Sequence, residues 1–171
     1  MCLQSLHNIR FVNSAVVGSE DCLYLSVYTH SLKPETLNPV LVYIHGGVFE
    51  FGGGEFEGRP GNFMDHDVVV VTMNYRLGPL GFLSMEDEIL PGNLGLKDQT
   101  MALRWVQRNI KNFGGDPKKV TIMGESAGGA SIYLHMISPM SKGLFFLKFL
   151  NEKKQNYVLP ITFIRNVGVY M

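Results

Sequence analysis

The residues best suited to chemistry lie in the stretch VTIMGESAGGAS, where Ser126 stands between Gly124 and Gly128. A serine on a sharp turn from a buried strand into a helix exposes its hydroxyl for attack on a carbonyl carbon. The apolar run before Ser126 predicts the strand, the residues after it predict the helix, and the two glycines leave room for the turn. A bare Gly-x-Ser-x-Gly pattern also occurs at ordinary strand-to-helix turns, but this context favours Ser126 as a nucleophile.

A second glycine-rich stretch, IHGGVF, follows an earlier apolar run and contains Gly46 and Gly47. Backbone N–H groups at the end of a strand can point away from the sheet and stabilise negative charge on a carbonyl oxygen. Losing one such donor typically slows catalysis by on the order of 10²–10³. A plain tight turn is the alternative for the glycine pair alone.

A base that could activate Ser126 is harder to find. In folds with this elbow the acid and the histidine follow the serine in the chain, and here only His135 and Glu152 do so. His135 is nine positions along the same predicted helix, about 13 Å away at 1.5 Å per residue, and a base must lie within about 3 Å. His45 ends an upstream strand, and we expect it to be structural. We expect the Glu125 side chain to point away from Ser126, in a structural or electrostatic role.

The elements that must position these groups follow from the apolar pattern. Continuous or alternating apolar runs predict four strands, and three- and four-residue spacing of apolar residues predicts helices. The glycines between them indicate tight turns, and strands separated by amphipathic helices indicate an α/β fold with a parallel sheet. The predicted strands are 23–28, 40–45, 67–74 and 119–124, the predicted helices are 96–113 and 126–137, and residues 57–63 are predicted to be a loop.

Composition narrows the classes of function. Apolar residues make up 46% of the 171 residues and charged residues 18%, so the chain can build a core. Fifteen basic and fifteen acidic side chains balance, which indicates neither a nucleic-acid surface nor an anionic-membrane patch. No apolar run is long enough for a spanning helix, and the first residues lack the pattern of a signal peptide. We expect no metal and no cofactor.

Two cysteines, Cys2 and Cys22, are 20 positions apart. Their count alone favours two free thiols. A bridge between them would close a loop worth roughly 3 kcal/mol in the chain-entropy account of disulfides.

Several longer motifs resemble the type-B carboxylesterases, the family that includes the cholinesterases. The resemblance covers about residues 2–145, is highly specific, and is strongest to insect general esterases. The motifs are GSEDCLYLSVYT, PVLVYIHGGVFEFGGG, VVVVTMNYRLGPLGFL, PGNLGLKDQTMALRWVQRNIKNFGGDPKKVTIMGESAGGAS and HMISPMSKGLF.

The resemblance implies an α/β-hydrolase fold and hydrolysis of small-molecule carboxylic esters through an acyl-serine intermediate. By position, Ser126 is the nucleophile. The N–H groups of Gly47, Val48 and Ala127 form the oxyanion hole, and Gly46 shapes the loop. The family usually has glycine or alanine where this chain has Val48, whose branched side chain would crowd the acyl pocket or tilt the donor.

The resemblance also implies a disulfide between Cys2 and Cys22, which reverses the interpretation from cysteine count. A disulfide indicates an oxidising compartment, so we expect the full-length parent protein to be secreted or to lie in the ER lumen. Glu125 favours a general esterase, because juvenile hormone esterases tend to have glutamine before the serine.

Members of this family are several times longer and carry the acid and the histidine far downstream of the elbow. We therefore expect residues 1–145 to be the N-terminal part of an α/β-hydrolase domain, with part of its mostly parallel sheet and flanking helices. The sequence changes character from Phe146, so residues 146–171 are expected to be an aberrant tail outside the fold. Such a chain would be inactive by itself. A non-catalytic, cholinesterase-like binding or adhesion module and a non-functional truncated product are the alternatives.

Overall fold

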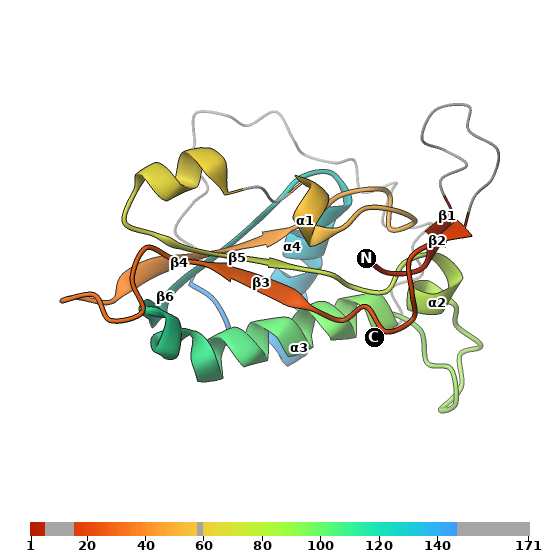
Figure 1. Ribbon diagram of the computed structural model, residues 1–171. Helices are drawn as coiled ribbons and strands as arrows, with labels where there is room; N and C mark the ends of the chain where they lie inside the picture. The colour runs from red at the N-terminus through yellow and green to blue at the C-terminus, as the bar shows by residue number, and fades with distance from the viewer. Residues whose placement is uncertain (6–15, 58–59, 147–171) are drawn as a thin grey trace.

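The structure is a computed structural model that describes residues 1–5, 16–57 and 60–146. Its main element is a four-stranded sheet with the strand order β3-β5-β4-β6 (Figure 1). β4 is parallel to both β5 and β6, and β3 is antiparallel to β5. The strands are β3 (Leu25–Tyr28), β4 (Asn38–Ile44), β5 (Val69–Met73) and β6 (Gly115–Gly124).

The antiparallel β3 fits the expected mostly parallel sheet, in which β4 pairs in parallel with both of its neighbours. Its four residues are all half-buried, whereas all five residues of β5 are buried. A strand with one solvated face is typical of antiparallel pairing, and a continuous buried run is typical of a parallel strand covered on both faces. The alternating pattern of residues 23–28 therefore fits an antiparallel strand at the edge of this sheet.

Helices and short turns connect the strands. In Figure 1, α3 runs below the strands and α1 lies above them. The predicted loop at 57–63 is partly wrong, because η2 begins inside it. The remaining elements are β1 (Gln4–Ser5), β2 (Val16–Val17), α1 (Gly54–Glu57), η2 (Gly61–Asp65), α2 (Gly78–Phe82), α3 (Leu94–Asn109), η3 (Ile110–Phe113), α4 (Ala127–Ile137) and η4 (Pro139–Ser141).

The core lies between the sheet and α3. The side chains of Leu103, Val106 and Ile110 follow the predicted helical spacing and are fully buried against the strands. The predicted helical segment ends at Gly114, whose φ of 79° is the left-handed conformation that glycine adopts readily. The strand valines and isoleucines that complete this core are Val40, Val42, Ile44, Val69, Val71, Val120 and Ile122.

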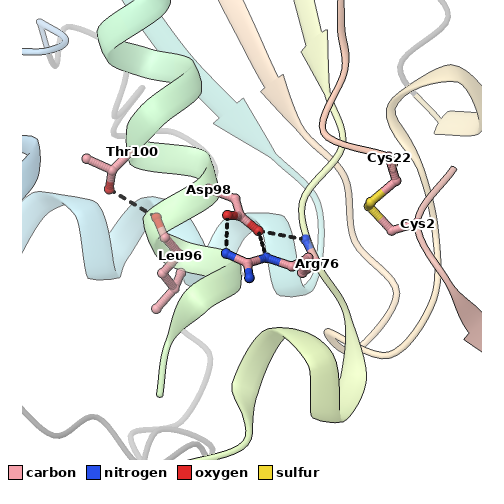
Figure 2. Close-up of polar contacts among 6 residues, drawn as sticks. All are labelled: Cys2, Cys22, Arg76, Leu96, Asp98 and Thr100. Carbon is pink, nitrogen blue, oxygen red and sulfur yellow. Dashed lines mark hydrogen bonds and ion pairs between the residues drawn. A yellow bond between two sulfur atoms is a disulfide. The ribbon is translucent and has the colours of Figure 1, made fainter. Parts of the chain in front are cut away.

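Two links brace this framework, and Figure 2 shows both. The disulfide between Cys2 and Cys22 is present, which confirms the pairing that the resemblance implied. Arg76, just beyond β5, holds Asp98 on α3: its backbone N–H and its Nε donate to Oδ2 at 3.1 and 2.8 Å, and its Nη2 donates to Oδ1 at 2.7 Å. The hydrogen bond with the buried carboxylate raises the pKa of Arg76.

None of the helices in the described ranges is both long and apolar enough to cross a bilayer.

Candidate active site

Ser126 occupies the junction between β6 and α4. The strand ends at Gly124, the helix begins at Ala127, and Ser126 between them has φ 54° and ψ −117°. Positive φ is uncommon for a residue with a side chain and costs on the order of 1–3 kcal/mol, so the surrounding structure must impose it. The side chain of Ser126 is exposed to solvent. The chain therefore presents a hydroxyl on a strained turn at the end of the central sheet.

The glycines on either side of Ser126 allow a very close approach to β4. A Cβ atom added at Gly128 would lie 2.0 Å from the backbone oxygen of Ile44, and one at Gly124 would lie 2.6 Å from the carbonyl carbon of Gly128. Gly129, the next residue, has its nearest neighbour at 3.6 Å. The first turn of α4 thus rests directly on the end of β4, which fits the room that the sequence analysis assigned to these glycines.

The glycine loop after β4 lies beside this turn. A Cβ added at Gly46 would lie 3.2 Å from the Cβ of Ser126 and 2.7 Å from the carboxylate oxygen Oε2 of Glu125. Gly47 has φ 97°, and its carbonyl accepts the N–H groups of Glu50 and Phe51 at 2.9 and 3.0 Å. The Glu125 carboxylate therefore lies against the glycine loop, and only a residue without a side chain fits at Gly46.

The three N–H groups assigned to an oxyanion hole belong to Gly47, Val48 and Ala127. Within the described part of the chain, none of them donates to a backbone acceptor of the loops and turns. The N–H of Ala127 lies at the first position of α4, where the helix dipole adds positive potential. Val48 has φ 57°, a strained conformation for a β-branched residue, and its side chain is 48% exposed.

His45 is 1% exposed and lies beneath the glycine loop. Its ring stacks on Tyr75 with centroids 4.2 Å apart, and its Nδ1 bonds to the carbonyl oxygen of Gly46 at 2.8 Å. The hydroxyl of Tyr75 donates to the backbone oxygen of His45 at 2.9 Å. These contacts place the buried His45 ring against the glycine loop, where it supports the loop structurally.

His135 is buried on the far part of α4, and both of its nitrogens bond to other side chains. Nδ1 is 2.8 Å from Ser141 Oγ and Nε2 is 2.9 Å from Gln99 Oε1. Burial lowers the pKa of His135 to about 4. Among the described side chains no histidine or carboxylate is hydrogen-bonded to the Ser126 hydroxyl, and Glu152 lies outside the described residues. The described residues thus contain a candidate nucleophile and candidate oxyanion donors, but no catalytic triad.

Sequence reasoning missed the polar residues buried behind the elbow. Gln99 stands four positions before Leu103, on the same helical stripe as the apolar core residues, and is fully buried. Ser131 lies four positions before His135 on the buried face of α4. The available signal was this spacing, which places polar side chains on a face that should be apolar.

A cavity of about 550 Å³ lies at the other end of α4, and Ser126 is not among its lining residues. Its walls include Leu134 and His135 of α4 and Lys97 of α3. The described residues contain no group of three or more histidine, cysteine or acidic side chains that could hold a metal ion.

A mostly parallel sheet, a glycine loop after β4 and a positive-φ serine between β6 and α4 together define the α/β-hydrolase class of fold. A solved structure supports this: juvenile hormone esterase from Manduca sexta, with OTFP covalently attached, superposes with a TM-score of 0.70 at 45% identity. That match covers 74% of this chain and 24% of the esterase.

The sequence profile of the Carboxylesterase family matches residues 1–148. The chain belongs to the carboxylesterase family. Venom carboxylesterase-6 of Apis mellifera is 54% identical over 148 residues, which are 85% of this chain and 26% of that protein. Juvenile hormone esterase of Tribolium castaneum is 54% identical over 145 residues, or 84% of this chain and 24% of that protein. The chain therefore spans about a quarter of the length of these relatives.

Proposed function

We propose that the whole protein is a carboxylic ester hydrolase in which Ser126 is the nucleophile. The observation that carries the proposal is the backbone of Ser126 itself. Its exposed hydroxyl stands on a positive-φ turn between β6 and α4, pressed against the glycine loop at Gly46. Strain of this kind persists only where the surroundings enforce it, and it concentrates at functional sites. The identity to insect esterases supports the same chemistry.

The geometry suits acyl transfer. Ser126 Oγ would attack the ester carbonyl carbon, forming a C–O bond while the carbonyl π electrons move to oxygen. The N–H groups of Gly47, Val48 and Ala127 would stabilise that oxyanion. Its collapse expels the alcohol and leaves an acyl-serine, which water then cleaves to a carboxylic acid and free Ser126. An acid and a histidine from beyond the described residues would remove and return the proton.

The substrate class we propose is a small-molecule carboxylic ester, and the proposed place of action is an oxidising secretory compartment. The disulfide between Cys2 and Cys22 supports that location, because such bridges persist outside the reducing cytosol. A similar venom carboxylesterase is consistent with secretion.

A fluorophosphonate that adds covalently to activated serines tests the proposal. We expect the product of the complete native transcript to gain one adduct at Ser126, located by peptide mass spectrometry, and the Ser126→Ala variant to gain none. The 171-residue chain should remain unlabelled, because no described side chain activates the hydroxyl. A folded complete protein that stays unlabelled would contradict the esterase and favour a non-catalytic binding module. Rapid labelling of the 171-residue chain would instead show that a base lies within it.

A further inference from the structure

Four buried polar side chains, called here the Gln99 cluster, connect three helices behind the elbow. Gln99 is on α3, Ser131 and His135 are on α4, and Ser141 ends η4. Their exposed fractions lie between 0 and 3%. Burying a polar group without a partner costs several kcal/mol, so groups at this depth persist only when their hydrogen bonds are complete.

Four hydrogen bonds of the cluster, taken in order, assign the proton on the His135 ring. Ser131 Oγ donates to the carbonyl of Ala127 at 2.9 Å and accepts from Gln99 Nε2 at 3.2 Å. Gln99 Oε1 is then the acceptor that faces His135 Nε2 at 2.9 Å, so that nitrogen must carry the proton. His135 Nδ1 is left as the acceptor for the hydroxyl of Ser141 at 2.8 Å. The cluster is thus satisfied by one neutral tautomer of His135.

One end of this chain of hydrogen bonds is the residue that follows the nucleophile. The carbonyl that Ser131 holds belongs to Ala127, whose N–H is a proposed oxyanion donor. The next residue, Gly128, is packed so tightly on Ile44 of β4 that a single Cβ would overlap its backbone oxygen. A rotation or shift of α4 would therefore displace Ala127 from the glycine loop.

The packing of α4 on β4 and β6 includes apolar contacts of Ala127, Ala130 and Ile132, which are not directional and tolerate small rotations of a helix. Hydrogen bonds require particular angles and distances, so a fully satisfied polar network selects one arrangement. We propose that the Gln99 cluster is a positioning network that fixes the rotation of α4 and so aligns Ala127 and Ser126 with the glycine loop. The alignment has catalytic meaning only if the proposed esterase function holds, whereas the network itself can be tested without any ester.

The test is hydrogen exchange and histidine NMR on the 171-residue chain. In Gln99→Leu, we expect faster exchange of the Ala130 amide, which donates to the backbone oxygen of Ser126 at 3.0 Å. The increase should be about tenfold, the effect expected for loss of the one hydrogen bond from Gln99 to Ser131. Amides of β4 and β6 should keep their rates. Gln107→Leu is the matched control: it is the same substitution on the same helix, but its bonds go to Pro117 and Leu144 instead of α4.

A second measurement does not require the variant to fold. In the unaltered chain, ¹⁵N shifts should show the His135 proton on Nε2 and none on Nδ1 at neutral pH.

Ser131→Ala, which removes the bond to Ala127, should reproduce the selective exchange of the first turn of α4. Uniformly faster exchange in all elements would reduce the cluster to a merely stabilising role, and a proton on Nδ1 would overturn the network. Neither result bears on whether Ser126 is labelled, so failure of the esterase proposal is separately visible.

Discussion

We expect acid to destabilise this protein through one buried imidazole, that of His135. The side chain is 3% exposed, and burial lowers its pKa to about 4 from the ordinary 6.5. Between those two pH values the unfolded chain binds a proton at this position that the folded chain does not bind. Stability contributed by the neutral imidazole is therefore present above pH 6.5 and is lost as the pH falls towards 4.

The size of the effect follows from the two pKa values of His135. Relative to pH 7, linkage predicts a loss of about 2 kcal/mol at pH 5 and about 3 kcal/mol at pH 4. For a domain of marginal stability this is a large fraction of the total free energy of unfolding. The hydrogen bonds to Gln99 and Ser141 suit the neutral ring, and protonation would turn Nδ1 from an acceptor into a donor.

Urea unfolding of the chain at pH 7, 5 and 4 measures this loss. In His135→Gln the titrating group is absent, so the variant should start less stable at pH 7 but lose about 2 kcal/mol less than the unaltered chain by pH 5. His66→Gln, which replaces an exposed histidine, is the control and should follow the unaltered chain. Equal losses in His135→Gln and the unaltered chain would refute a buried neutral imidazole.

Three further changes test the framework by urea unfolding. Gly128→Ala should destabilise by at least about 2 kcal/mol because its Cβ meets the Ile44 backbone, while Gly129→Ala, with space for a Cβ, should not destabilise; equal effects would contradict the packing. Asp98→Asn should lower the free energy of unfolding by about 1–3 kcal/mol, because Asp98 is buried. Lys119→Ala removes an exposed ion pair and should lower it by less than about 1 kcal/mol; a larger loss in Lys119→Ala than in Asp98→Asn would contradict this reasoning. Reducing the disulfide should cost roughly 3 kcal/mol, and an unchanged midpoint would exclude a stabilising bridge.

Much of the sheet was predictable because burial on both faces leaves a readable pattern. The run around Val69–Met73 became a central strand, and the spacing of Leu103, Val106 and Ile110 became the buried face of α3. The direction of β3 was not predicted, although its alternating pattern is typical of an antiparallel strand with one solvated face. The short elements between β4 and β5 were missed because their glycines indicate turns without specifying a helical turn.

At the candidate site, sequence alone determined the residue types and their order: a serine in a glycine elbow, a glycine pair after an earlier strand, and two cysteines. It also showed that His135 is too far along its helix to serve Ser126, because helix rise is constant. Only the tertiary structure decided that Gly46 lies against Ser126 and that Gly128 rests on Ile44. It alone paired Arg76 with Asp98 and joined Gln99, Ser131, His135 and Ser141. Local patterns report each residue's own helix or strand. All of these contacts except the one between His135 and Ser141 join positions 22 to 84 residues apart, so they depend on how the whole sheet and its helices pack.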